Sequence, residues 1–186
     1  MKKIILFFLF FFLFYNTILN TKEVKMILEL KYGKVEIELF EDVAPLHVKR
    51  IKTLVEKGEY NGVVFHRVID GFMAQTGDVQ FGNSSKDSFD LRLAGTGGSS
   101  LPDLKAEFSN IPHERGTLSM ARSSNPNSGN SQFFICFGSQ PHLDRNYTVF
   151  GKVVNGMEYI DKIQKGSGPN GSVDDPDKII KLSLNK

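Results

Sequence analysis

The chain of 186 residues has no tryptophan and a single cysteine, Cys136. One cysteine cannot form an internal disulfide, and its place in an apolar run (residues 133–137) predicts a small core residue rather than a nucleophile. The four histidines are scattered, and no group of cysteines and histidines has zinc spacing. We therefore expect no metal and no other cofactor.

The sequence also lacks an excess of charge outside its N-terminal segment. Removing Lys2 and Lys3 with that segment leaves 21 of the 23 basic residues against 21 acidic residues. A nucleic-acid partner is excluded, because phosphate-backbone binding needs a basic stripe. The glycine-rich residues 95–98 lack the Lys-Ser/Thr pair and the following helix of a phosphate-binding loop, so a surface loop is predicted there.

Residues 1–21 differ from the rest of the chain. Lys2 and Lys3 precede an unbroken apolar run (residues 4–15), which predicts a signal peptide and an exported, periplasmic protein. No Ala-x-Ala cleavage site follows, so a retained membrane anchor that leaves the body facing the periplasm stays open as an alternative. The run is short for a bilayer span of about 20 residues. Residues 22–186 are predicted to form one domain, acting as a monomer.

Sixteen phenylalanines, 17 glycines and short periodic runs predict a fold dominated by β-structure. A hairpin is expected over residues 27–39, and a helix from Pro45 to the residue before Gly58. Further strands are expected at 63–68, 72–75, 116–120, 132–137, 148–154 and 178–184, with a short second helix ending at Gly166. The sum is an antiparallel β-barrel of about eight strands with two α-helices over its ends.

The stretch 65–78 concentrates the side chains suited to binding. Arg67, Phe72, Met73 and Gln75 lie within nine residues, and strand alternation on either side of a turn lets the arginine and the glutamine reach one surface. Such a site can hydrogen-bond a carbonyl or an amide, but it contains no group that attacks a bond. His66 is out of phase with Arg67 and is expected to be structural.

Six motifs occur in order along the body of the chain. They are FHRVI at 65–69, GFMAQTGD at 71–78, GTGG at 95–98, GTLSMA at 116–121, SQFFI at 131–135 and VFG at 149–151. On these motifs, residues 26–186 resemble the cyclophilins, a family of peptidyl-prolyl cis/trans isomerases. The resemblance implies an eight-stranded antiparallel barrel capped by two helices, which agrees with the fold predicted from the pattern.

The resemblance also implies roles for individual residues. Arg67 corresponds to the catalytic arginine, and Gln75 to the glutamine that steadies it. The implied substrate-binding set comprises the proline pocket, a polar wall residue and two residues whose backbone pairs with peptide. In chain order its members are Phe72, Met73, Ala121, Arg122, Gln132, Phe134, His142, Leu143 and Tyr147.

Three positions depart from the eukaryotic pattern and resemble bacterial members. His142 replaces a tryptophan, Tyr147 a histidine and Arg122 an asparagine. The first change implies weaker binding of cyclosporin, because the tryptophan acts as a hydrogen-bonding lid in drug-sensitive members. The longer segment 79–94 is expected to shape access to a neighbouring specificity pocket.

The implied reaction is rotation about X-Pro bonds in proline-containing polypeptides, which assists their folding. Amide conjugation sets a barrier of about 18–20 kcal/mol, and no covalent bond breaks during the rotation. A site without nucleophile or cofactor is what this reaction needs. A non-catalytic proline-peptide binding module or chaperone on the same fold is the alternative.

Overall fold

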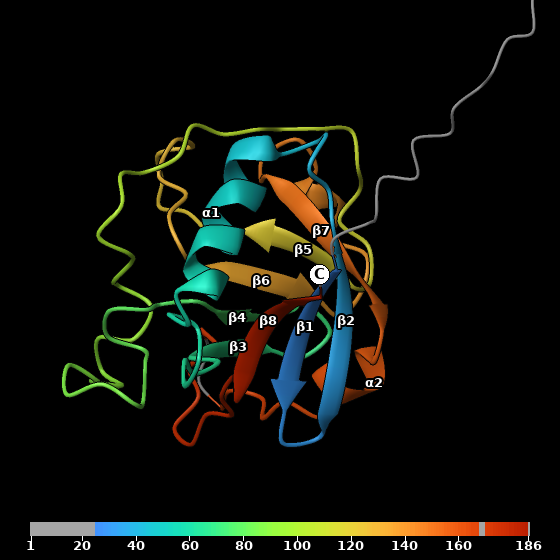
Figure 1. Cartoon of the computed structure of the whole chain (residues 1–186). Helices are drawn as coiled ribbons and strands as arrows, with labels where there is room; N and C mark the ends of the chain where they lie inside the picture. The colour runs from blue at the N-terminus through green and yellow to red at the C-terminus, as the bar shows by residue number, and fades with distance from the viewer. Residues whose placement is uncertain (1–24, 168–169, 186) are drawn as a thin grey trace, which may run out of the picture.

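The computed structural model describes residues 25–167 and 170–185, and it is dominated by β-structure (Figure 1). The strands, in chain order, are β1 (Lys25–Leu30), β2 (Gly33–Leu39), β3 (Arg67–Ile69), β4 (Met73–Thr76), β5 (Thr117–Met120), β6 (Phe133–Cys136), β7 (Val149–Asn155) and β8 (Lys181–Asn185). The helices are α1 (Pro45–Glu56), α2 (Met157–Ile160) and the single 3-10 turn η1 (Pro141–Leu143).

The eight strands form one antiparallel sheet in the order β3-β4-β6-β5-β7-β2-β1-β8. The sheet curls so that its two edges approach, and the segment leading into β8 spans the gap. Main-chain bonds join this segment to the chain before and within β3, from Phe65 N–H to Asp177 O and from Val68 N–H to Gly171 O. The predicted antiparallel barrel with two helices is confirmed.

Alternation in β1 and β2 sets the inner face of the barrel. Met26, Leu28 and Leu30 are buried on β1, and Val35 and Ile37 continue the same surface on β2. In this antiparallel pair Leu28 lies opposite Val35. The side-chain period of two thus separates the core residues of both strands from their outward-facing residues.

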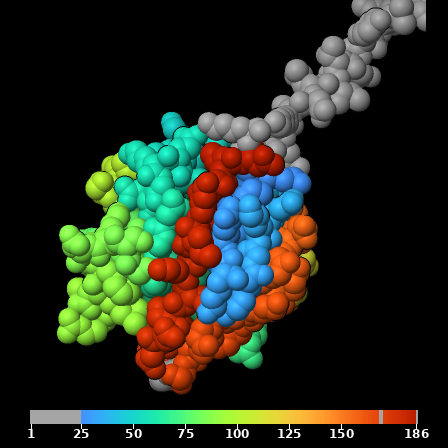
Figure 2. All heavy atoms as spheres, turned by 60° about the horizontal axis from the view of Figure 1, so that its bottom comes forward, coloured from blue at the N-terminus to red at the C-terminus, as the bar shows by residue number. Residues whose placement is uncertain are grey.

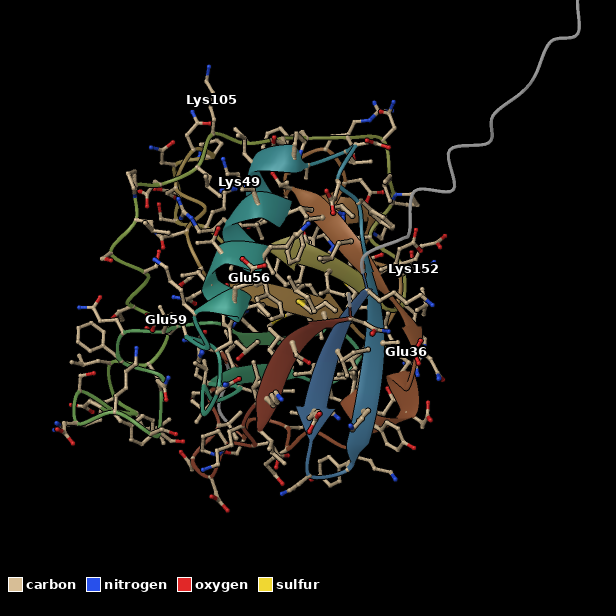
Figure 3. The ribbon with its side chains drawn as sticks, in the orientation of Figure 1. Glu36, Lys49, Glu56, Glu59, Lys105 and Lys152 are labelled. Carbon is tan, nitrogen blue, oxygen red and sulfur yellow. The ribbon has the colours of Figure 1, made fainter. Side chains whose placement is uncertain are left out.

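Helix α1 covers one open side of the barrel. Pro45 opens it in the first turn, and its apolar side chains Val48, Ile51 and Leu54 are buried. Figure 2 shows β8 between this helix and β1 on the molecular surface. Figure 3 labels Lys49 and Glu56 on the helix, and both side chains are exposed. The helix is thus amphipathic in the expected sense.

Strands β4 and β6 are buried on both faces, and this places a second cluster outside the barrel. Ala74, Phe133 and Ile135 join the main core, whereas Phe134 and Met73 belong to a separate apolar cluster. Every residue of β6 is buried. A sheet covered on both sides can therefore present one apolar face as the floor of a site.

Several predicted boundaries differ from the structure. The strand expected at 63–68 is reduced to β3, since Val63 and Val64 make only isolated bridges, to Asn83 and Lys178. The second helix ends at Ile160, six residues before Gly166, and turns follow it. The signal peptide or anchor predicted at residues 1–21 lies outside the described residues. Within the described ranges, no helix is long and apolar enough to cross a membrane.

Candidate active site

A cavity of about 300 Å³ opens over the second apolar cluster. Ten of the eleven predicted site residues line it; the eleventh, Gln132, lines the adjoining cavity. The ten are Arg67, Phe72, Met73, Gln75, Ala121, Arg122, Phe134, His142, Leu143 and Tyr147. The structure thus brings residues from β3, β4, β6 and the loops around η1 to one place.

Arg67 is held on two sides by hydrogen bonds. It lies directly opposite Gln75 in the β3–β4 pair, and its Nη1 donates to Gln75 Oε1 over 3.1 Å. Its Nε donates to the main-chain oxygen of Asn170 over 2.8 Å. Burial lowers the pKa of the guanidinium below its ordinary value. The Nη2 group has no partner among the described residues, so it is the donor left for a ligand.

The two amide side chains beside Arg67 continue the chain of hydrogen bonds. Gln75 Nε2 donates to Gln132 Oε1 over 3.0 Å. Gln132 Nε2 donates to the carbonyl oxygens of Gly95 and Gly97, at 2.9 and 2.8 Å. Carbonyls only accept and a guanidinium only donates, so each amide has a single orientation that satisfies both of its neighbours. This chain of hydrogen bonds fixes the direction in which the Arg67 guanidinium points.

Asp78 anchors the glycine loop at the far end of this chain. One oxygen of its buried carboxylate accepts the N–H groups of Gly95 and Gly97, over 2.8 and 2.9 Å. Gly95 has φ +98°, and a Cβ there would lie 2.8 Å from the ring of His66. Only glycine fits this position, because the conformation is left-handed and the loop lies against the buried histidine.

The apolar walls of the cavity come mostly from aromatic side chains. Tyr147 meets the Phe134 ring edge-on, with centroids 5.8 Å apart. His142 lies against Phe72 with centroids 5.6 Å apart, at the position where the resemblance implied a missing tryptophan. Leu143 and Phe134 are almost wholly buried. The resulting pocket is apolar, and Arg67 lies at its edge.

Arg122 separates the pocket from a second cavity of about 520 Å³ and lines both. Its guanidinium carbon lies 4.3 Å from the centroid of the Tyr147 ring, and its donors bind the main-chain oxygens of Asn146 and Ser123. The Ala121 N–H already donates to Gln132 O. Of the two residues expected to pair with peptide through their backbone, only Arg122 therefore has an N–H without a partner among the described residues.

The segment 79–94 does not itself line the second cavity, which is bounded by the glycine loop and residues 121–132. The segment lines a third cavity, of about 420 Å³, together with the end of α1 and residues 98–101. The bond from Gly95 N–H to Asp78 Oδ2 joins the two ends of the segment, and Gly98 and Ser99 line both the second and the third cavity, so the influence of the segment on the neighbouring pocket stays a prediction.

Cys136 belongs to the apolar cluster below the pocket, and burial raises the pKa of its thiol to about 12. Across residues 25–167 and 170–185, no group of three or more His, Cys, Asp or Glu side chains could hold a metal ion. The arrangement offers hydrogen-bond donors and an apolar pocket, and these suit binding of a carbonyl beside an apolar ring.

Sequence reasoning missed the groups that position the site. The carbonyl oxygens of Asn170, Gly95 and Gly97 are main-chain atoms, so no side chain marks them. It also missed His113 and Asp144, whose side chains join the loop before β5 to the loop after η1. Their spacing of 31 residues carries no local signal.

Comparisons with known proteins agree with this site and fold. The family model described as cyclophilin type peptidyl-prolyl cis-trans isomerase/CLD matches residues 24–184. A probable peptidyl-prolyl cis-trans isomerase of Brucella suis is 62% identical over 160 residues, which cover 86% of this chain and 81% of that protein. A peptidyl-prolyl cis-trans isomerase-like protein of Gallus gallus is 43% identical, covering 72% of this chain and 77% of its own.

Solved structures give the same result. A cyclophilin type isomerase of Cryptosporidium parvum superposes with a TM-score of 0.73 at 27% identity, over 88% of this chain and 98% of that chain. A cyclophilin of Hirschia baltica gives a TM-score of 0.70 at 27% identity, over 85% and 72%. The chain belongs to the cyclophilin-type peptidyl-prolyl cis-trans isomerase family. Its expected activity, isomerisation of X-Pro bonds, is confirmed over the non-catalytic alternative.

Proposed function

We propose that Arg67 is the catalytic residue of this isomerase and that Gln75 and Gln132 hold it in place. The observation that carries the proposal is the hydrogen-bond chain from the glycine loop to Arg67, which ends at the edge of the apolar pocket in Nη2, a donor without a partner in the described part of the chain. This donor is aimed by the protein before any ligand arrives. Preorganised donors stabilise a transition state without reorganising during the reaction.

The free donor suits the chemistry of amide rotation. In the twisted amide the prolyl nitrogen is pyramidal and carries a lone pair, which a planar amide delocalises into its carbonyl. A guanidinium that donates to this lone pair, or to the prolyl carbonyl, binds the twisted form more strongly than either planar form. Such differential binding lowers the barrier. Arg67 stays protonated throughout the physiological range even with a lowered pKa.

The proline ring would occupy the apolar pocket. Phe72, Met73, Phe134, Leu143 and Tyr147 surround a volume suited to one ring, and all five line the same cavity. The Arg122 N–H would pair with the peptide main chain beside the proline. A second crystal structure of the Cryptosporidium parvum isomerase was determined in the presence of the dipeptide Ala-Pro, which supports proline-containing polypeptides as the substrates here. The protein would act as a monomer.

The test is cis/trans exchange of a short X-Pro peptide, measured by NMR with wild type and Arg67→Ala. We expect a large loss of exchange rate in the variant, of about 100-fold or more, by analogy with the loss of one transition-state donor. Arg92→Ala is the matched control, because Arg92 is an exposed arginine whose side chain pairs with Asp90. Equal rates for wild type and Arg67→Ala would refute the assignment.

We also propose that the protein is exported and works on polypeptides outside the cytosol. The charged start and apolar run of residues 1–21 support this. In the alternative, the run is retained as an anchor and the folded body faces the periplasm. Mass spectrometry of the protein from its native host separates the two, since a mature N-terminus near Lys22 excludes the anchor and an intact N-terminus excludes cleavage.

A further inference from the structure

One wall of the pocket is formed by Leu143 and Tyr147, which lie on a loop. The main chain of this loop makes few hydrogen bonds that would fix its position. After η1 the N–H groups of the loop make turn bonds, such as Asn146 N–H to Leu143 O, and the Arg122 side chain donates to Asn146 O. Arg145 has φ +60°, a left-handed conformation that a residue with a side chain adopts at a cost. Such a conformation persists where the surroundings hold it. Something outside the loop must therefore fix this wall.

His113 supplies that support from the loop before β5. Its carbonyl accepts the N–H of Gln140 over 2.7 Å, and its own N–H donates to Asp144 Oδ1 over 2.8 Å. Its ring Nδ1 lies 3.0 Å from the same carboxylate oxygen. The ring also stacks on Phe134, with centroids 6.2 Å apart and planes 20° apart. The residue thus contacts both the floor of the pocket and its wall.

The other ring nitrogen extends the connection to β7. His113 Nε2 lies 3.0 Å from Ser119 Oγ, and Ser119 Oγ donates to Thr148 O over 3.0 Å. His113 and Ser119 are fully buried. The chain Asp144–His113–Ser119–Thr148 therefore begins and ends on the two sides of Tyr147, the aromatic wall residue.

We infer that His113 is a positioning residue for the proline pocket, fixing the wall that carries Leu143 and Tyr147 through Asp144 and Ser119. The inference rests on the proposed function, which assigns the proline ring to this pocket. The carboxylate accepts only, so Nδ1 carries a hydrogen in either charge state. Nε2 is then an acceptor in the neutral ring and a donor in the imidazolium.

Protonation of His113 completes the chain of hydrogen bonds from Asp144 to Thr148. In the neutral form, the single Ser119 hydroxyl hydrogen must serve either His113 Nε2 or Thr148 O, so one of these contacts is lost. In the imidazolium, Nε2–H donates to Ser119 Oγ, whose hydrogen then stays on Thr148 O. Burial lowers the pKa of His113. The hydrogen bonds that Asp144 accepts from the main-chain N–H and the ring of His113 lower the pKa of this carboxylate. The carboxylate therefore remains charged while the His113 ring titrates.

The titratable and charged groups around the pair are few. His142 and Arg145 belong to the wall loop, and Cys136 lies on β6. His142 is a second histidine beside the wall, and it lines the pocket itself. The experiment therefore uses a His142→Gln parent, in which His113 is the histidine left beside the wall.

The test measures KM and kcat for an X-Pro peptide between pH 5 and 7.5, in the parent and in Asp144→Asn. A wall that grips the ring equally in ground and transition states acts on KM, so Asp144→Asn is expected to raise KM about threefold to tenfold with kcat within a factor of two. The parent's KM should fall as the pH is lowered, and that of Asp144→Asn should not. Asp161→Asn is the matched control, since Asp161 pairs with Arg115 away from the pocket. An Asp144→Asn variant with the parent's KM and pH profile overturns the inference.

A measurement on the unmodified protein covers the case of a variant that does not fold. Nitrogen NMR of the labelled whole chain should show the Nδ1–H tautomer of His113 at neutral pH, and signals of Leu143 and Tyr147 that move as this ring titrates. The Nε2–H tautomer, or wall signals that stay fixed during the titration, overturns the inference. Failure of the proposed function looks different, because Arg67→Ala would then retain full exchange activity.

Discussion

Replacing Arg67 by lysine separates the charge of the catalytic group from its geometry. Arg67 uses Nε for Asn170 O and Nη1 for Gln75 Oε1, which leaves Nη2 for the substrate. The single ammonium of a lysine keeps the charge, but it cannot reach both holding partners and the substrate from three directions. We expect Arg67→Lys to fold normally and to isomerise slowly.

The size of the loss follows from one misplaced donor. A hydrogen bond to a charged group contributes about 1.5–3 kcal/mol. Each 1.36 kcal/mol in the barrier is a factor of ten, so kcat/KM should fall about 10- to 150-fold. Arg67 is half-buried, and water can replace part of the lost bond, so the lower part of this range is expected.

NMR line shapes of an X-Pro peptide give the exchange rate, and Arg92→Lys controls for the same substitution at an exposed site. Activity of Arg67→Lys within a factor of two of wild type would refute the reasoning. A point charge would then suffice, and the hydrogen-bond chain that orients the guanidinium would have no catalytic role.

Three further outcomes follow from the same contacts. Gln132→Leu should lower kcat/KM several-fold and shift the NMR signals of the glycine loop, because the loop loses the donor it shares with the site; unchanged loop signals would contradict this. Gly95→Ala should destabilise the fold by about 1–2 kcal/mol more than Gly71→Ala in urea unfolding, since both have positive φ but only Gly95 faces a side chain, that of His66. Burial lowers the pKa of His66 to about 4, so the unfolded chain binds a proton between pH 6.5 and 4 that the folded chain does not. The free energy of unfolding should then fall by about 3 kcal/mol as the pH drops across this window, and His66→Leu should lack that part of the slope.

The fold was predictable where one face of an element is buried. β1, β2 and α1 each bury one side, so their periodicity gives both the element and its inner face. β6 is buried throughout, so no alternation separates its barrel side from its pocket side. The strand expected at 63–68 was too long because Val63 and Val64 bridge to irregular segments, whose positions depend on how the barrel closes.

The candidate site was predictable from the sequence to a smaller extent. The pairing of Arg67 with Gln75 follows from a tight turn between two short strands, which local pattern can anticipate. Phe134, Leu143 and Tyr147 reach the pocket from distant parts of the chain, and only the resemblance to a family assigned them a place there. Asn170 contributes a carbonyl oxygen, which any residue could supply, so no sequence signal marks it.

The hydrogen-bond chain explains why the two amides are glutamines. It starts at the carbonyls of Gly95 and Gly97, which only accept, and ends at Arg67, which only donates. Every intermediate group must then accept on one side and donate on the other, as Gln132 and Gln75 do. A carboxylate at either position would face an acceptor, and an aliphatic side chain would break the chain. The glycine loop therefore determines, through two side chains, the direction in which Arg67 presents its free donor to the pocket.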